Sequence, residues 1–275
     1  MTFSIVARSA DGESWGVAVA SKFLAVGSAV PAAVAGIGAI ATQADANVAY
    51  KGIALAHLDE GATAQVALDR LLEDDEGRDH RQVGIVDVDG GAATYTGPRC
   101  FDWAGGVTDT GVAIQGNILA GPQVIEAMKT SWDSTHAEPD LSRRLLRALV
   151  AGDRAGGDSR GRQSAALLVV RDQAGYGGAD DVAVDLRVDD HEQPCAELER
   201  LLDLNDLYLT ASTDDEKVTI TPELQTELDD RARKLGHPDF IAWVGTENFE
   251  MRVGKASGDR HWVDEKVLEI LRHAA

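Results

Sequence analysis

The 275-residue chain has few cysteines, no long apolar run and no recognisable secretion signal. Its two cysteines, Cys100 and Cys195, form no C-x-x-C pair, which argues against a disulfide framework and a cysteine metal site. The longest apolar stretch, residues 24–35, is interrupted by Pro31 and is shorter than the ~18 residues of a membrane helix. The first residues lack a basic start followed by an apolar core, so we expect a cytoplasmic protein.

Positive charge is also scarce. The chain has 46 acidic against 26 basic residues, a formal net charge of −20. Nucleic acids and anionic membranes would be repelled, so we expect neither as a partner. Only 7 of the basic residues are lysine and 19 are arginine. An acidic, lysine-poor composition suits a high-salt cytoplasm, but GC-rich coding also favours arginine, and both explanations stay open.

Common motifs of cofactor and metal enzymes are missing. The sequence contains no G-x-x-x-x-G-K-[ST] phosphate loop and no H-E-x-x-H. A G-x-G-x-x-A string at residues 36–41 lies within a β-prone run that continues beyond it, which is the wrong setting for a dinucleotide site. The seven histidines are scattered. We therefore expect no cofactor and no dedicated metal site.

The chain does contain β-prone runs in groups, separated by helical patterns. We predict strands at residues 4–7, 15–20, 36–42, 82–88, 92–96, 111–115, 165–171 and 182–188, and helices at 45–60, 62–73, 122–131, 141–151 and 194–204. Many of these strands are apolar on both faces. This order predicts an α+β fold, a four-layer αββα sandwich of two stacked, mainly antiparallel sheets with helices outside.

The composition changes after Leu204. Helical patterns at residues 222–235 and 264–271 flank a Trp/Phe-containing stretch at 240–245. We predict a sandwich domain at 1–204 and a small, mostly helical C-terminal domain at 213–275, joined through a polar linker at residues 204–215 with its exposed stretch at 212–216. In the alternative, Phe240, Trp243 and Trp262 pack onto the sandwich as a lid or brace.

Thr2 is the first candidate for chemistry because it directly follows the initiator Met1. Threonine is small enough for an aminopeptidase to remove the preceding methionine. The freed α-amine, with a pKa of roughly 7.7–8.0, can then act as a general base for the hydroxyl of the same residue. Many proteins begin with Met-Thr, so this reading needs support from the rest of the chain.

Polar stretches at the ends of predicted strands are further candidates. Gln43 and Asn117 could donate amide hydrogen bonds, or simply belong to a helix cap and a turn. Lys22 could lower the pKa of Thr2 if the first hairpin brings it near, and is otherwise a surface lysine. Candidate pocket residues, which could instead lie in a surface loop and a salt-bridged strand end, are Arg160, Arg162, Gln163, Ser164, Asp189 and His191.

Taken as a set, these stretches resemble a known family. Residues 1–8, 16–27, 41–44, 115–117, 155–167 and 185–191 are similar to the family called domain of unknown function 1028, which looks like a branch of the N-terminal-nucleophile (Ntn) hydrolases. The resemblance spans roughly residues 1–205. It implies the αββα fold with the nucleophile at the free end of a central strand. The tail, residues 243–250, resembles a module assigned to peptidoglycan binding in some family members.

In Ntn hydrolases the terminal residue attacks an amide carbonyl, its own amine moves the proton, and nearby amides hold the oxyanion. The resemblance therefore implies Thr2, Lys22 and Asn117 as catalytic residues. It implies a substrate pocket formed by Gln43, Arg160, Arg162, Gln163, Ser164, Asp189 and His191.

We expect a hydrolase of a linear amide C–N bond in a small polar, carboxylate-bearing molecule. The alternative is a non-catalytic protein that binds a metabolite or a partner on the same scaffold. We also expect a homo-oligomer, most simply a dimer. Leu145, Leu146 and Leu149 could form an outer helix face for it, although core packing is the other use of such residues.

Overall fold

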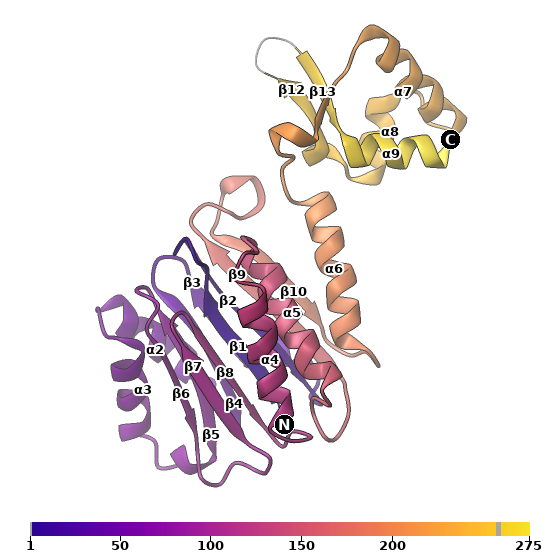
Figure 1. Cartoon of the computed structure of the whole chain (residues 1–275). Coiled ribbons are helices and arrows are strands. Elements are labelled where there is room, and N and C mark those ends of the chain that lie inside the picture. The colour runs from indigo at the N-terminus through magenta and orange to yellow at the C-terminus, as the bar shows by residue number, and fades with distance from the viewer. Residues whose placement is uncertain (1, 257–259) are drawn as a thin grey trace. The chain divides into compact units, whose positions relative to one another are not determined.

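The computed structural model describes residues 2–256 and 260–275 (Figure 1). The chain divides into two compact units, Met1–Leu201 and Leu202–Ala275, and the division falls within α6 (Pro194–Tyr208). Of the helices in the described ranges, none combines the length and the apolarity that a membrane crossing needs.

The first unit contains a six-stranded antiparallel sheet. Its strand order is β10-β9-β2-β1-β8-β7. The strands are β1 (Thr2–Arg8), β2 (Ser14–Ser21), β7 (Gly105–Asp109), β8 (Val112–Asn117), β9 (Ser164–Arg171) and β10 (Val182–Val188). Because residues 3–7 of β1 pair with β2 on one side and β8 on the other, β1 lies inside the sheet.

A four-stranded antiparallel sheet stacks on the first. Its order is β3-β4-β5-β6, formed by β3 (Pro31–Val34), β4 (Gly38–Ala44), β5 (Arg81–Asp87) and β6 (Ala92–Thr96). Strands β4 and β5 contact β1 across the stack. The packed layer between the sheets is apolar over most of its area, with Val6, Val17 and Val19 meeting Ala41 and Val86 in one cluster.

Helices cover both outer faces. In Figure 1, α2 (Tyr50–Asp59) and α3 (Ala64–Glu73) lie against the four-stranded sheet, and α4 (Gln123–Ser134) and α5 (Leu141–Arg154) lie against the six-stranded sheet. A short α1 (Val26–Ala29) follows β2. The predicted α+β sandwich of two stacked antiparallel sheets with outer helices is thereby confirmed.

The helix α5 turns its apolar face inward. Leu145, Leu146 and Leu149 are at most 2% exposed, and α5 packs on β1, β2 and β9. Of the two uses that the sequence left open for these leucines, the structure shows core packing. They offer no outer face for a partner.

Some elements differ from the predicted ones. The helix predicted to begin at residue 45 begins at Tyr50, because residues 45–49 make side-chain and turn hydrogen bonds such as Asn47 Oδ1 with the Ala49 N–H. Strands β3 and β7 were not predicted. Both are edge strands, where Pro31 and the Gly105-Gly106 pair are tolerated although they hide the β pattern.

The second unit combines three helices with a small sheet in the described residues. Helices α7 (Pro222–Lys234), α8 (Phe240–Glu247) and α9 (Glu265–Ala274) accompany an antiparallel sheet of β11 (Lys217–Thr219), β13 (Arg260–Asp264) and β12 (Val253–Ala256). Phe240 and Trp243 are buried in the core of this unit together with Leu228 and Val267. The helical pattern was predicted; the sheet was not.

The linker predicted near residues 212–216 is wrong. Ser212 is only 7% exposed, and its hydroxyl donates to Asp264 Oδ2 at 2.6 Å. Residues Asp214–Glu216 form a 3-10 turn with a capping box. These residues therefore belong to the second unit, because their polar groups are used within it.

Candidate active site at the start of the central strand

Thr2 begins β1 at the point where three strand ends meet. It is 6% exposed, and its Oγ1 lies 3.1 Å from the Oγ of Ser21, the last residue of β2. On the other side Thr2 pairs in register with Asn117, the last residue of β8. The antiparallel order of the sheet thus places residues 2, 21 and 117 together at one end of the sheet, where β1 begins and β2 and β8 end.

The layer between the sheets becomes polar at this end. Ser4 Oγ donates to Gln43 Oε1 at 2.7 Å and accepts from Gln115 Nε2 at 2.7 Å. Gln82 Oε1 accepts from Gln43 Nε2 at 2.9 Å and from Asn117 Nδ2 at 2.8 Å. All five side chains are at most 2% exposed. Their mutual bonds satisfy groups whose burial would otherwise be costly.

This amide network also holds the backbone of Thr2. The Thr2 carbonyl accepts from Gln43 Nε2 at 3.3 Å and from Asn117 Nδ2 at 3.4 Å. Since both amides are engaged with Thr2 and Gln82, they position the start of β1 rather than project into open space. The predicted role of Asn117 as an oxyanion donor is therefore not the use its amide has in this structure.

Asp158 ties the loop before β9 to the end of β2. It is 7% exposed, and its carboxylate accepts from the Lys22 N–H at 2.7 Å and the Arg160 N–H at 2.9 Å. Its side chain also pairs with Arg160 Nη2 at 3.3 Å. A short bridge between Leu119 and Asp158 holds the loop against the residues that follow β8.

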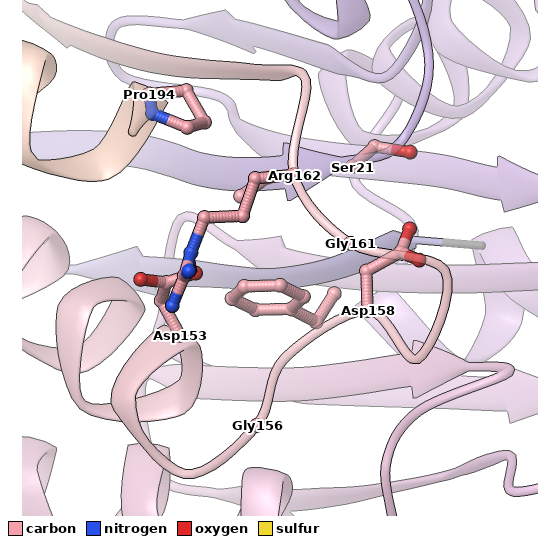
Figure 2. Close-up of a pocket in the computed structure, with 9 residues that line it drawn as sticks. Ser21, Asp153, Gly156, Asp158, Gly161, Arg162 and Pro194 are labelled. Atoms are coloured by element: carbon pink, nitrogen blue, oxygen red, sulfur yellow. Dashed lines mark hydrogen bonds and ion pairs between the residues drawn. The ribbon is translucent and has the colours of Figure 1, made fainter. Parts of the chain in front are cut away.

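A small pocket of about 80 Å³, called here the Phe3 pocket, opens beside Ser21. Its walls include Phe3, Ser21, Asp153, Asp158, Arg162 and Pro194. Figure 2 shows Arg162 and Asp153 pointing toward one another on one side, and Ser21 and Asp158 on the other. Arg162 Nε lies 2.7 Å from Asp153 Oδ1, so this pair is neutralised within the pocket wall.

A larger pocket of about 250 Å³, called here the strand-end pocket, lies on the Asn117 side. Its walls include His80, Arg99, Cys100, Phe101, Asn117 and Arg160. Burial raises the pKa of the Cys100 thiol, so this group is protonated near neutral pH. Ser21 lines one pocket and Asn117 the other, and Thr2 contacts both residues.

The strand-end pocket has a strained backbone. Ala44 ends β4 and Ile118 directly follows β8, and both residues line this pocket. Their φ angles are 67° and 48°. A left-handed conformation costs a non-glycine residue of order 1–3 kcal/mol, and a β-branched residue adopts it rarely. Such strain is retained only where the surrounding structure enforces it, and it gathers at functional sites.

The remaining candidates lie outside both pocket walls. Lys22 is exposed and its Nζ donates to the Arg162 carbonyl at 3.1 Å. Ser164 is fully buried, where its Oγ donates to the Phe23 carbonyl. Gln163 Nε2 donates to Asp190 Oδ1 at 3.1 Å. Asp189 and His191 are exposed, and His191 Nδ1 accepts from the Gln193 N–H.

The structure thus brings together Thr2, Gln43, Asn117, Arg160 and Arg162 around one strand end. The sequence reasoning missed Ser21, Gln82, Asp158, His80, Arg99 and Cys100. Within residues 2–256 and 260–275, no group of three or more His, Cys, Asp or Glu side chains has an arrangement suited to a metal ion.

Comparison with known proteins identifies the family. Residues 2–198 match the model of the "Family of unknown function (DUF1028)". The chain belongs to the DUF1028 family. The DUF1028 match covers the sandwich and ends before the second unit. The resemblance to the DUF1028 family that was expected from the sequence is thereby confirmed.

A solved DUF1028 structure is similar over most of its length. The crystal structure of a protein from Silicibacter pomeroyi, which carries the same family label, is 31% identical to this chain with a TM-score of 0.67. The similarity covers 78% of this chain and 90% of that one. Among curated proteins, none matches the chain.

Proposed function

We propose that this DUF1028 protein hydrolyses a linear amide C–N bond in a small polar, carboxylate-bearing molecule, with Thr2 as an N-terminal nucleophile after Met1 is removed. One observation carries the proposal. Thr2 Oγ1 lies at the start of a central strand, 3.1 Å from Ser21 Oγ, and the two neighbours of Thr2, Ser21 and Asn117, line two different pockets. An extended substrate could place one end in each pocket and its amide at Thr2.

In this proposal the hydroxyl of Thr2 attacks the amide carbonyl carbon while the α-amine of Thr2 accepts the hydroxyl proton. The amine then returns that proton to the departing nitrogen, which leaves an ester on Oγ1 that water hydrolyses. Ser21 Oγ orients the attacking hydroxyl through its hydrogen bond. Gln43 and Asn117 act as positioning residues, because they fix the carbonyl of the same threonine.

The intact mass of untagged protein tests the first requirement. We expect a mass lower than that of the full sequence by one methionine residue, because Thr2 is small enough to permit its removal. Retention of Met1 on the whole population would contradict the proposal, since an acylated nitrogen cannot accept the hydroxyl proton.

A second candidate function is the non-catalytic binding of a metabolite or partner by the same pockets. The closed amide network and the 6% exposure of Thr2 favour this function, because a buried, hydrogen-bonded Thr2 can form a fixed pocket wall without reacting. It predicts that Thr2→Ala leaves ligand affinity unchanged and that no amide is turned over.

Cellular setting and partners follow as proposals. We propose a cytoplasmic homo-oligomer, most simply a dimer, that acts on a small molecule without a cofactor. It binds neither nucleic acid nor membranes, in keeping with its net charge of −20.

The second unit is proposed as a docking module. Its sequence likeness to a peptidoglycan-binding module makes pull-down on purified peptidoglycan a direct test, with the fragment 1–204 as the control.

A further inference from the structure

The strand-end pocket concentrates positive charge in a chain that is strongly acidic. Arg99 and Arg160 line it together with the imidazole of His80, although the whole sequence has only 26 lysines and arginines against 46 acidic residues. The walls also include the carboxylate of Asp45, which pairs with Arg81 Nη1 at 3.3 Å. Pocket walls held close together focus such a field and favour a ligand of opposite charge.

Arg99 is the basic residue best placed to meet a ligand. Its side chain is 68% exposed, and its ion pair with Asp79 is long, with Nε 3.8 Å from Oδ2. In the part of the chain that the structure describes, no hydrogen bond engages the two Nη groups of Arg99. A guanidinium with both Nη groups available can bind a carboxylate through two parallel hydrogen bonds.

The two arginines of the glycine-rich loop face different pockets. Arg162 lines the Phe3 pocket, where Asp153 neutralises it at 2.7 Å. Arg160 lines the strand-end pocket beside Asn117, and its Nη2 pairs with Asp158 at 3.3 Å. The left-handed residues Ala44 and Ile118 line the same pocket. The strand-end pocket therefore combines basic side chains, two left-handed residues and Asn117, the register partner of Thr2. Within the described residues, the Phe3 pocket does not combine these three features.

We propose that the strand-end pocket binds the carboxylate of a small substrate, with Arg99 as the principal anchor and His80 and Arg160 beside it. The orientation of the substrate rests on the proposed function, in which Thr2 is the nucleophile. In that case the carboxylate end of the substrate lies on the Asn117 side of the scissile amide. The uncharged end then lies toward the Phe3 pocket, whose charges are already paired.

The thiol of Cys100, which lines the pocket, gives a test that needs neither the substrate nor Thr2. Iodoacetate and iodoacetamide alkylate a thiol by the same displacement of iodide, but only iodoacetate carries a carboxylate. Cys195 is 3% exposed, so Cys100 is the site of reaction in the folded full-length protein. The rates are measured by peptide mass spectrometry, and the quantity compared is the ratio of the iodoacetate rate to the iodoacetamide rate.

We expect this ratio to be about 10-fold higher for folded protein than for the same protein unfolded in guanidinium. Arg99→Gln should abolish most of the increase. Arg99→Lys keeps the positive charge but loses the two parallel Nη donors of the guanidinium, so it should retain part of the increase. Arg147→Gln is the matched control. Arg147 is a half-exposed arginine on α5 paired with Glu138 at 3.1 Å, so its loss should leave the ratio unchanged.

Several results would overturn the assignment. A folded ratio equal to the unfolded one, or a ratio unchanged in Arg99→Gln with a native melting curve, would each exclude a carboxylate-accepting pocket. Protection of Cys100 by inorganic phosphate at concentrations where acetate gives none would assign the pocket to a phosphate instead. Retention of Met1 would end the hydrolase proposal without affecting any of these outcomes.

Discussion

Among single residues, Thr2 separates the two candidate functions. Thr2→Ala removes the side-chain hydrogen bond to Ser21, and a typical hydrogen bond contributes about 1 kcal/mol, so the variant should fold. We expect it to lose at least about 10³-fold in hydrolysis of any amide that the wild type cleaves in a panel of N-acyl amino acids, because the nucleophile is gone. Thr2→Ser should keep measurable turnover.

Calorimetry on the same variants provides the control. Unchanged affinity of Thr2→Ala for the same ligand, with turnover lost, supports catalysis by Thr2. Equal turnover in Thr2→Ala and wild type would contradict it.

Arg252 is the buried cation that organises the second unit. Its guanidinium donates to Asp264 Oδ2 at 2.8 Å and to the Leu207 carbonyl at 3.0 Å, and both charged side chains are at most 3% exposed. Arg252→Met leaves the Asp264 carboxylate without its ion-pair partner. We expect a loss of about 3–5 kcal/mol at pH 7, measured by hydrogen exchange within residues 202–275. Lys217→Met, which breaks an exposed pair with Asp214, should cost under about 1 kcal/mol.

The same pair predicts a dependence on pH. Burial works against the charge of Asp264, but hydrogen bonds from Ser212, the Lys266 N–H and Arg252 outweigh it and hold the pKa of this carboxyl below its ordinary value. A lowered pKa in the folded state stabilises the fold above the unfolded-state pKa of about 3.9. That contribution is lost as pH falls through the folded pKa. The exchange difference between wild type and Arg252→Met should therefore be full above about pH 5 and shrink toward pH 3. A difference that stays constant down to pH 3 would contradict this.

Part of the candidate site could be predicted because it depends on strand ends. Thr2 begins β1 and Asn117 ends β8, and pairing of these two strands brings them together. Gln43 lies one residue before the end of β4 and reaches Thr2 because the second sheet stacks on the first. Gln82 also carried a signal, an amide directly before the apolar run 83–86. Arg99 carried none, because its loop has no periodicity and is placed by long-range contacts such as its N–H with the Asp79 carbonyl.

Within the strands, Gly84 of β5 makes room for the amide network. An alanine Cβ there would collide with the Oε1 of Gln115, whose Nε2 donates to Ser4. We expect Gly84→Ala to destabilise the sandwich by about 1–3 kcal/mol in urea unfolding, since buried hydrogen bonds must break or shift. Gly52→Ala in α2 is the matched control, because nothing lies within 4 Å of the added Cβ. It should stabilise by about 0.5–1 kcal/mol. Equal effects of the two changes would show that the network tolerates displacement.

Helices and strands were predictable where apolar residues recur with helical or alternating spacing. They were not predictable in edge strands, where proline and glycine are tolerated and interrupt the alternation. The hairpins of β1 with β2 and of β5 with β6 follow their patterns, and both form. Strand β7 begins with two glycines and is an edge strand paired with β8, so little in its sequence marks it. The small sheet of the second unit went unpredicted because its strands are only three to five residues long.

For the whole molecule, the two compact units predict independent folding of the sandwich. A fragment of residues 1–204 should be soluble and melt cooperatively, because its layers and cores lie within residues 1–201. Thermal melting in the salt that supports the full chain measures this. An insoluble fragment, or one without a cooperative transition, would show that the second unit is needed for the first to fold.

The proposed oligomer is tested by light scattering. We expect a mass of about twice the 29.2 kDa of one chain, at low and at high salt. Since Leu145, Leu146 and Leu149 are buried, a polar substitution there would unfold the chain rather than release monomers. A monomeric mass at every salt concentration would refute the dimer.

The position of Thr2 at the start of β1 has a practical consequence for the recombinant protein. Any residues fused ahead of it, such as an amino-terminal affinity tag, convert its nitrogen into an amide that no longer accepts a proton at neutral pH. A tagged preparation would keep the pockets and lose the proposed base. It would then behave as a binding protein in every assay, so only a carboxy-terminal tag, or a protease that leaves Thr2 first, preserves the distinction between the two functions.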